Sequence, residues 1–262
     1  APVTMNISVG MDREAGVNRF EGDVVIGEGS ADVAGDRLSL SGGRLHGHYD
    51  IDSDELIIDQ IALAGDRTRI GGDIRVRDVS AIMRAAPNEP AAFNISLPSM
   101  RVDVPGTFAE PLAITNVEVA GSIISAQRTV NVSRITARAG DGRFNGTGRL
   151  YWTDVDGSAH TGVQLDGALE GAVDARAVMH MWPVGLGESV REYLARTITG
   201  GRVTDATVHI NVLPGDLIDG ALQDDAIDVR FNIDSASMEF ISTMSPVTHA
   251  RGSGILRGNS FS

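Results

Sequence analysis

The chain has no cysteine and no lysine, and only 5% of its 262 residues are aromatic. Without cysteine there is no disulfide framework, no thiolate nucleophile and no Cys-type zinc site. The 22 basic residues are all arginines, and 35 acids bring the formal net charge to -13. Because nucleic acids and anionic lipid surfaces are bound by clustered cations, this balance argues against a nucleic-acid partner and against an electrostatic clamp onto lipid headgroups.

Long hydrophobic runs are also missing. No stretch reaches the roughly 18 to 20 consecutive apolar residues of a membrane-spanning helix, and residues 1–10 have neither the basic nor the apolar segment of a secretory signal. The sequence opens in an alternating pattern at residues 3–9 and closes inside another at residues 252–256. We therefore expect a piece of a longer protein, with any anchor or signal outside it.

Alternation of apolar and polar residues dominates what is present. Its period of two is typical of strands with one buried face, and the breaks fall at clusters of Gly, Asp and Ser that suit hairpin turns. At 42% apolar residues the chain can form a core. A mostly β fold is predicted: a long, strongly curved antiparallel sheet with a few short helices, or alternatively a β-sandwich.

The strand pattern repeats without a gap. Moving the numbering from Leu38 to Leu112 superimposes residues 38–76 on residues 112–150, with identical residues at several positions that include Gly47/Gly121 and Arg69/Arg143. In both copies the apolar phase slips by one residue at the same place, after Ile58 and after Val132. A shared slip indicates a β-bulge or a tight turn, and hence a bend, in each copy.

Short helices interrupt the strands at residues 78–87, 174–183 and 188–199. The first two begin with an aspartate and end at a proline, and the third has an apolar face at spacings of three and four followed by Gly200-Gly201. We divide the chain into a first β segment (1–76), a short helix (78–87), a second β segment (93–173), a helical insert (175–201) and a third, truncated β segment (202–262).

Catalytic and metal-binding patterns are scarce. The sequence contains no nucleophile elbow, no HExxH and no P-loop. His46 and His48 share one strand face, but no third ligand accompanies them, so no metal site or cofactor is predicted. The acids are spread over turns and polar strand faces, which disfavours a carbohydrate-active enzyme with paired carboxylates. We predict that the protein is not an enzyme.

One motif stands out near the second helix. Trp182-Pro183 is followed by Arg191-x-Tyr193-Leu194 and then by Gly200-Gly201 and a new strand. This run resembles the Trp-Pro…Arg-x-Trp-Leu…Gly-x-Val signature of the long AsmA-like bacterial envelope proteins of the YhdP type, with Tyr193 in place of the second tryptophan. Trp182 and the neighbouring His180 are otherwise typical of side chains that plug the end of a sheet.

The resemblance implies a periplasmic protein anchored in the inner membrane by a segment outside this chain. Its repeated β-sheet would form a hydrophobic groove that holds phospholipid acyl chains during transport between the inner and outer membranes. Other envelope proteins would be further partners. The family motif comprises Trp182, Pro183, Arg191, Tyr193, Leu194 and Gly201. The candidate lining residues are Leu40, Leu45, Tyr49, Leu56, Ile58, Ile61, Ile70, Val76, Ile114, Val119, Ile123, Val130, Val132, Ile135, Phe144 and Leu150.

The residues alone leave a second interpretation open. A one-sided sheet can also be a structural or adhesive repeat module that acts through protein contacts. That alternative predicts a dry interior and exposed apolar patches on the outside.

Overall fold

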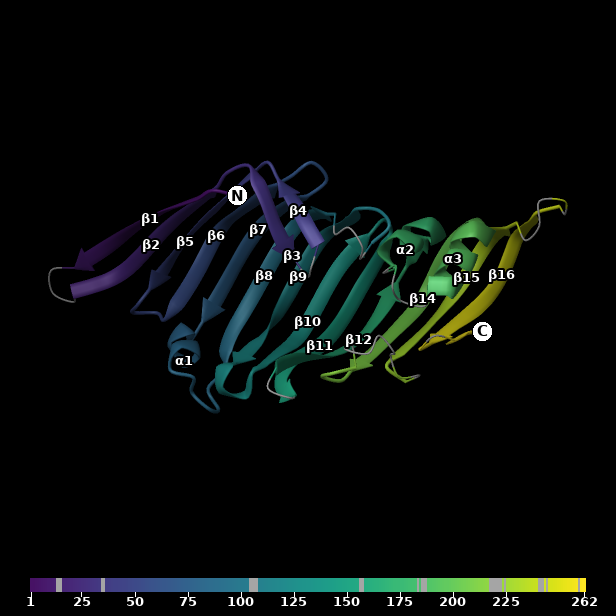
Figure 1. The fold of residues 1–262 in the computed structure, drawn as a ribbon. Helices are drawn as coiled ribbons and strands as arrows, with labels where there is room; N and C mark the ends of the chain where they lie inside the picture. Colours follow the sequence, from purple (N-terminus) through teal and green to yellow (C-terminus); the bar gives the residue numbers. More distant parts are fainter. Residues whose placement is uncertain are drawn as a thin grey trace. The chain divides into compact units, whose positions relative to one another are not determined.

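A computed structural model describes the chain (Figure 1), and its described residues are 1–12, 16–33, 36–103, 108–155, 158–182, 184, 188–216, 223, 225–239, 243, 245–258 and 260–262. The protein is mostly β and has three short α-helices within those residues. The predicted antiparallel sheet with a few short helices is confirmed. None of these helices is long and apolar enough to span a membrane.

The chain divides into two compact units. The first comprises residues 1–105 and 111–134, and the second comprises residues 106–110 and 135–262. Each unit is described by itself below.

The first unit is built on antiparallel strands in the order β1-β2-β5-β6-β7-β8-β9-β10, and residues 129–134 of β10 belong to it. The short helix α1 (Val79–Met83) lies at the strand ends beside β8, β9 and the 3-10 turn Ser125–Gln127 (Figure 1). The strand bounds are β1 Val3–Asp12, β2 Gly16–Ile26, β5 Gly42–Asp50, β6 Glu55–Ala64, β7 Arg69–Arg77, β8 Ala91–Val102, β9 Leu112–Ile124 and β10 Thr129–Ala139.

The other sheet of this unit contains only β3 (Gly29–Val33) and β4 (Asp36–Leu40). A sandwich needs a second sheet large enough to cover the first. Among the described residues the first unit has no such layer, so the sandwich alternative is wrong.

The second unit continues with antiparallel strands in the order β11-β12-β14-β15-β16-β17, and β13 pairs with β14. Its helices are α2 (Ala175–Met181) and α3 (Glu188–Thr197), both in contact with β14. The strand bounds are β11 Gly142–Val155, β12 Ser158–Glu170, β13 Ala172–Asp174, β14 Ile198–Val212, β15 Ile227–Met238, β16 Val247–Arg257 and β17 Ser260–Phe261.

The sequence repeat corresponds to a group of consecutive strands. The same shift that takes Leu38 to Leu112 carries β5, β6 and β7 onto β9, β10 and β11. The phase slip after Ile58 is a register shift: Ile58 pairs with Ile74, whereas Ile61 pairs with Gly72. The predicted bulge in the first copy is therefore confirmed.

The helices are shorter than the patterns predicted. Helix α1 ends at Met83, because Ala85 already lies in the left-handed region at φ 48°. Helix α3 ends at Thr197, because Ile198 pairs with Met238 and begins β14. Strand pairing takes over at a β-branched residue that fits a sheet better than a helix.

The two helices that begin with aspartate are also capped differently. The Asp174 side chain accepts hydrogen bonds from the Arg176 and Ala177 amides, at 2.9 and 3.2 Å, and so caps α2. Asp78 makes no such bond, since its backbone is left-handed at φ 57°. For α1 the turn between β5 and β6 supplies the cap instead.

Candidate functional site

The strongest candidate site is one face of the sheet in the first unit, which we call the apolar face. Cross-strand partners point to the same side of a sheet, so the register places residues on faces. One continuous row crosses β1, β2 and β5–β9, and its members are Val9, Phe20, Tyr49, Leu56, Val76, Phe93 and Gly121. A second row crosses β1, β2 and β5–β7, and its members are Met5, Val24, Leu45, Ile61 and Gly72.

A third row completes the apolar face over β6–β9: Ile58, Ile74, Ile95 and Val119. These side chains are half-buried within the sheet rather than enclosed. Among the described residues of the first unit, the buried apolar side chains are only Leu40, Ala81, Ala91 and Phe93. Within the part of the first unit that the structure describes, most of the apolar face therefore has no covering layer of protein.

Exposure is greatest on β1. Val3, Met5, Ile7 and Val9 follow each other on the apolar face, and they are between 50% and 67% exposed. Natural strands at a sheet edge usually carry charges or prolines that discourage pairing with other chains. Residues 3–10 contain neither charges nor prolines, so these four exposed apolar side chains on β1 are unusual for a protein surface.

Most predicted lining residues lie on the apolar face. In the first unit these are Leu45, Tyr49, Leu56, Ile58, Ile61, Ile70, Val76, Ile114, Val119 and Ile123. Val130, Val132 and Ile135 lie in β10, and Phe144 and Leu150 point to one face of β11 in the second unit. Leu40 differs: it belongs to the two-stranded sheet and pairs with Gly29.

Sequence reasoning missed the contribution of strands outside the repeat. Val3, Met5, Ile7 and Val9 alternate visibly in the sequence, but only positions matched between the two copies entered the predicted lining. In β8 the alternation breaks at a register shift, where Leu97 and Pro98 stand opposite Gly72. The period-two signal in β1 could have identified its residues, whereas the bulge in β8 masks the pattern.

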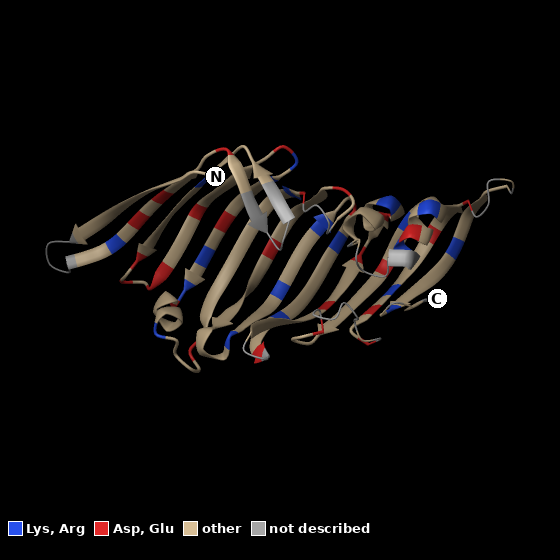
Figure 2. Cartoon of the chain, in the orientation of Figure 1, with Lys and Arg blue, Asp and Glu red and all other residues tan. Residues whose placement is uncertain are grey.

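The opposite face of this unit is polar. Figure 2 marks the charged residues along the strands and at the strand ends, and the register places Asp23, His46 and Gln60 together on this polar face. His46 and His48 do share this face, as predicted, since they pair with Asp23 and Glu21 on β2. The described residues contain no group of three His, Cys, Asp or Glu side chains that could hold a metal ion.

His46 joins three strands on the polar face. Its Nδ1 atom lies 2.6 Å from Asp59 Oδ1, and its Nε2 atom lies 3.1 Å from Glu21 Oε1. The hydrogen bond to Asp59, followed by that to Glu21, raises the pKa of His46 above its ordinary value. The same contact lowers the pKa of Asp59. The imidazole thus serves as a structural bridge between carboxylates.

A polar clamp at the strand ends holds α1. The Tyr49 hydroxyl donates to Asp54 at 2.8 Å, and the Ser80 amide and hydroxyl donate to the same carboxylate at 3.0 and 2.6 Å. The Ser80 hydrogen bonds lower the pKa of Asp54. Tyr49 therefore contributes its ring to the apolar face and its hydroxyl to the anchoring of α1.

The second unit differs, because α2 and Trp182, which directly follows α2, pack on buried apolar clusters. Trp182 packs against a buried cluster formed by Val212, Ala226, Ile227 and Leu256. This agrees with the interpretation of Trp182 as a plug, while His180 Nδ1 lies 3.4 Å from Glu110 at the surface. A further buried cluster comprises Ala175, Val203 and Ala206, with Val178 of α2 packed against it.

The motif residues work together in this packing. Arg191 of α3 donates from Nε to the Trp182 carbonyl at 3.2 Å, so it joins α3 to the end of α2. Leu194 is 4% exposed, whereas Tyr193 is exposed. Pro183 lies outside the described residues. The arginine and leucine of the motif therefore have structural roles.

Gly201 is the remaining motif residue. Its φ is +138°, and a Cβ atom at this position would lie 3.0 Å from the Cα of the buried Ala236 on β15. Only glycine combines this backbone conformation with so close an approach. The neighbouring Gly200 has no comparable contact, since its nearest neighbour would be 3.9 Å away.

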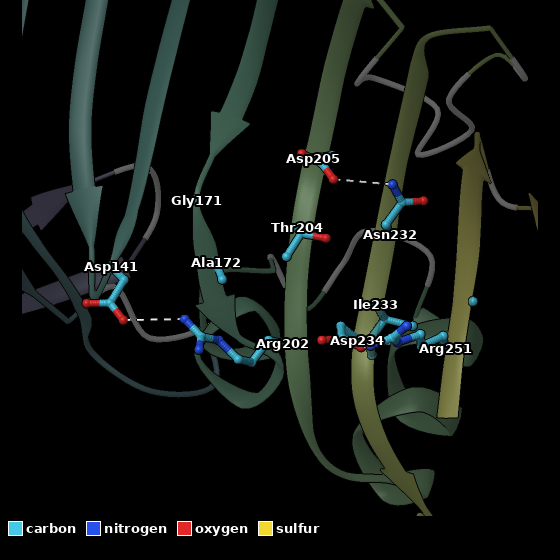
Figure 3. A pocket seen from close by; sticks show the side chains of 11 residues that line it. Asp141, Gly171, Ala172, Arg202, Thr204, Asp205, Asn232, Ile233, Asp234 and Arg251 are labelled. Atoms are coloured by element: carbon cyan, nitrogen blue, oxygen red, sulfur yellow. Dashed lines mark hydrogen bonds and ion pairs between the residues drawn. The ribbon is translucent and has the colours of Figure 1, made fainter. Parts of the chain in front are cut away.

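A polar depression of about 720 Å³ lies on the other face of the second unit (Figure 3). Four of its five charged side chains form ion pairs: Arg202 lies 3.4 Å from Asp141, and Arg251 lies 2.6 Å from Asp234. The fifth, Asp205, accepts a hydrogen bond from Asn232 Nδ2 at 3.5 Å. Arg251 holds the pKa of Asp234 below its usual value. The depression therefore offers a ligand little unsatisfied charge and is the weaker candidate.

Comparisons with known proteins add no relative to this description. No protein-family model, no curated protein and no solved structure matches the chain.

Proposed function

We propose that the chain is a phospholipid-binding segment of an AsmA-like envelope protein and that acyl chains lie on its apolar face. The observation that carries this proposal is the wide apolar face of the first unit, most of which no described residue covers. An exposed apolar surface of this extent is costly in water, and its occupant must itself be apolar.

The dimensions of the apolar face suit an acyl chain. Strands lie about 4.8 Å apart, so the row from Val9 to Gly121 across seven strands extends for about 29 Å. A tail that spans one leaflet needs only about half of the 30 Å hydrocarbon core of a bilayer. Each methylene removed from water contributes about 0.8 kcal/mol, so even partial coverage favours binding.

The composition of the apolar face also favours flexible tails. Most members of its rows are Val, Leu, Ile or Met, which adapt to a mobile hydrocarbon chain better than flat aromatic surfaces do. The motif around Trp182 adds the resemblance to AsmA-like proteins, from which a periplasmic location, an inner-membrane anchor outside this chain, lipid transport and a role in envelope integrity follow as parts of the proposal.

Native mass spectrometry of the purified chain tests the proposal. We expect adducts with phospholipid masses that disappear after delipidation and return when phospholipid is added back. A well-folded chain that carries no lipid after purification and takes up none on addition would refute it.

A structural module that acts through protein contacts is the second candidate. The exposed row on β1 favours it, because an uncharged edge strand readily pairs with another strand. Sedimentation velocity of the delipidated chain separates the two functions. Self-association that added phospholipid does not reverse would favour protein contacts, whereas a lipid-binding monomer would contradict them.

A further inference from the structure

Two arginines stand directly opposite each other on the polar face of the first unit. Arg69 on β7 pairs with Arg101 on β8, close to the ends of both strands. Like charges in opposite positions destabilise a sheet, so such a pair is usually relieved by a nearby acid. Both arginines are exposed, and neither makes an ion pair or side-chain hydrogen bond with any residue that the structure describes.

The acids nearest along the chain do not fill this role. Asp103 is engaged by Arg67, whose Nε atom lies 3.2 Å from Asp103 Oδ2. Asp66 lies in the turn before β7 and makes no described contact with either arginine. The local surplus of positive charge contrasts with the net charge of -13 for the whole chain.

The surroundings leave room for a ligand. Arg69 and Arg101 are flanked in their cross-strand row by Ala64 and Ala113. The next row on the same face consists of Ala62, Gly71, Ser99 and Thr115. Small side chains keep both guanidinium groups accessible, and the two exposed hydroxyls supply further hydrogen-bond donors.

The repeat contains a natural comparison. Arg143 occupies the position of Arg69 in the second copy, but the residue opposite Arg143 is Glu170. The second copy thus places a carboxylate where the first copy places another cation. Among the described residues, the cross-strand neighbour of Arg69 is therefore a second cation, whereas that of Arg143 is an acid.

We propose that Arg69 and Arg101 form a binding site for a phosphate group. A guanidinium donates two parallel hydrogen bonds to phosphate, and two guanidinium groups side by side match its several oxygens. The negative charge of the chain excludes long-range attraction of anions, so recognition is short-ranged and sensitive to salt. The site lies on the opposite face from the proposed acyl-chain surface and does not depend on that function.

Isothermal titration of the full chain with inorganic phosphate at low salt tests the site. The Arg101→Glu variant imitates the Arg143–Glu170 arrangement and should lose about tenfold or more in affinity. Arg75→Glu is the matched control, because Arg75 is exposed on the same face of β7 and makes the same change in net charge. We expect less than a twofold loss for Arg75→Glu.

Flotation with vesicles identifies the source of the phosphate. Phosphatidylglycerol vesicles are compared with vesicles of a phosphate-free neutral galactolipid, using the same variants. Vesicle binding that Arg101→Glu abolishes and Arg75→Glu preserves assigns the site to lipid headgroups. Phosphate binding without such vesicle binding assigns it to a soluble phosphate compound. Absence of binding in both assays, or equal losses in the two folded variants, overturns the proposal.

Discussion

Ile57 and Ile58 provide a sharp test of the apolar face, because they are neighbouring isoleucines on opposite faces of β6. Ile58 pairs with Ile74 on the apolar face, whereas Ile57 pairs with His48 and Arg75 on the polar face. Both side chains are half-buried. The substitutions Ile58→Asp and Ile57→Asp therefore remove the same side chain and add the same charge, and they differ only in the face affected.

The expected effect of Ile58→Asp follows from the lost contacts. A tail that crosses this position forfeits contact with about two methylenes, or about 1.6 kcal/mol at about 0.8 kcal/mol each. This loss corresponds to about a fifteenfold weaker affinity, and desolvation of the new carboxylate increases it. Ile57→Asp should leave the affinity within about threefold of the parent, since its carboxylate faces Arg75.

Titration with a fluorescent acyl-chain phospholipid measures both affinities, and circular dichroism with thermal melting establishes that each variant is folded. Equal losses of lipid affinity in the two folded variants would refute the assignment of tails to the apolar face. Retention of full affinity by Ile58→Asp would refute it as well.

Three further predictions concern packing and pH. Gly201→Ala should lower the free energy of unfolding by about 1–3 kcal/mol in urea titrations, because the backbone has a positive φ and the new Cβ atom is crowded against β15. Gly200 has room for a Cβ atom, so a comparable loss of stability in Gly200→Ala would contradict the argument from crowding. Arg191→Ala should cost about 1–2 kcal/mol of stability by the same method, since the Trp182 carbonyl loses its donor, and an unchanged midpoint would show that the bond contributes nothing. The pKa of His46 is raised in the folded protein, so its protonation stabilises the fold. This stabilisation is complete below the ordinary histidine pKa, near 6.5, and is lost as the pH rises through the raised pKa. Melting temperatures should fall over that interval in the parent and change less in His46→Gln; parallel curves would contradict the assignment.

Much of the fold could be predicted from the chain alone. The period-two alternation identified strands such as β1 and β5–β7, and the shared slip located the bulge after Ile58. These features depend on residues that are close together along the chain, because alternation of apolar and polar residues directly indicates which side of a strand is buried. The helix ends were less predictable, because α3 gives way to β14 through pairing with a distant strand.

The candidate site was predicted in part. Positions matched by the repeat identified ten residues of the apolar face in the first unit. Leu40, in contrast, belongs to the two-stranded sheet of β3 and β4. The cap of α1 could not be foreseen either. It comes from Asp54 in a preceding turn, although Asp78 stands at the helix start in the sequence.

The sequence by itself determined that this protein has strands with one apolar side, because alternation is a local property. Only the tertiary structure decided that Trp182 and α2 pack on apolar clusters of the second unit. The structure also shows that, within the part of the chain that it describes, no layer covers most of the apolar face of the first unit. It also decided that Arg69 meets Arg101, whereas Arg143 meets Glu170. Such pairings join residues far apart in the chain, and they depend on strand order and register, which alternation within a strand does not encode.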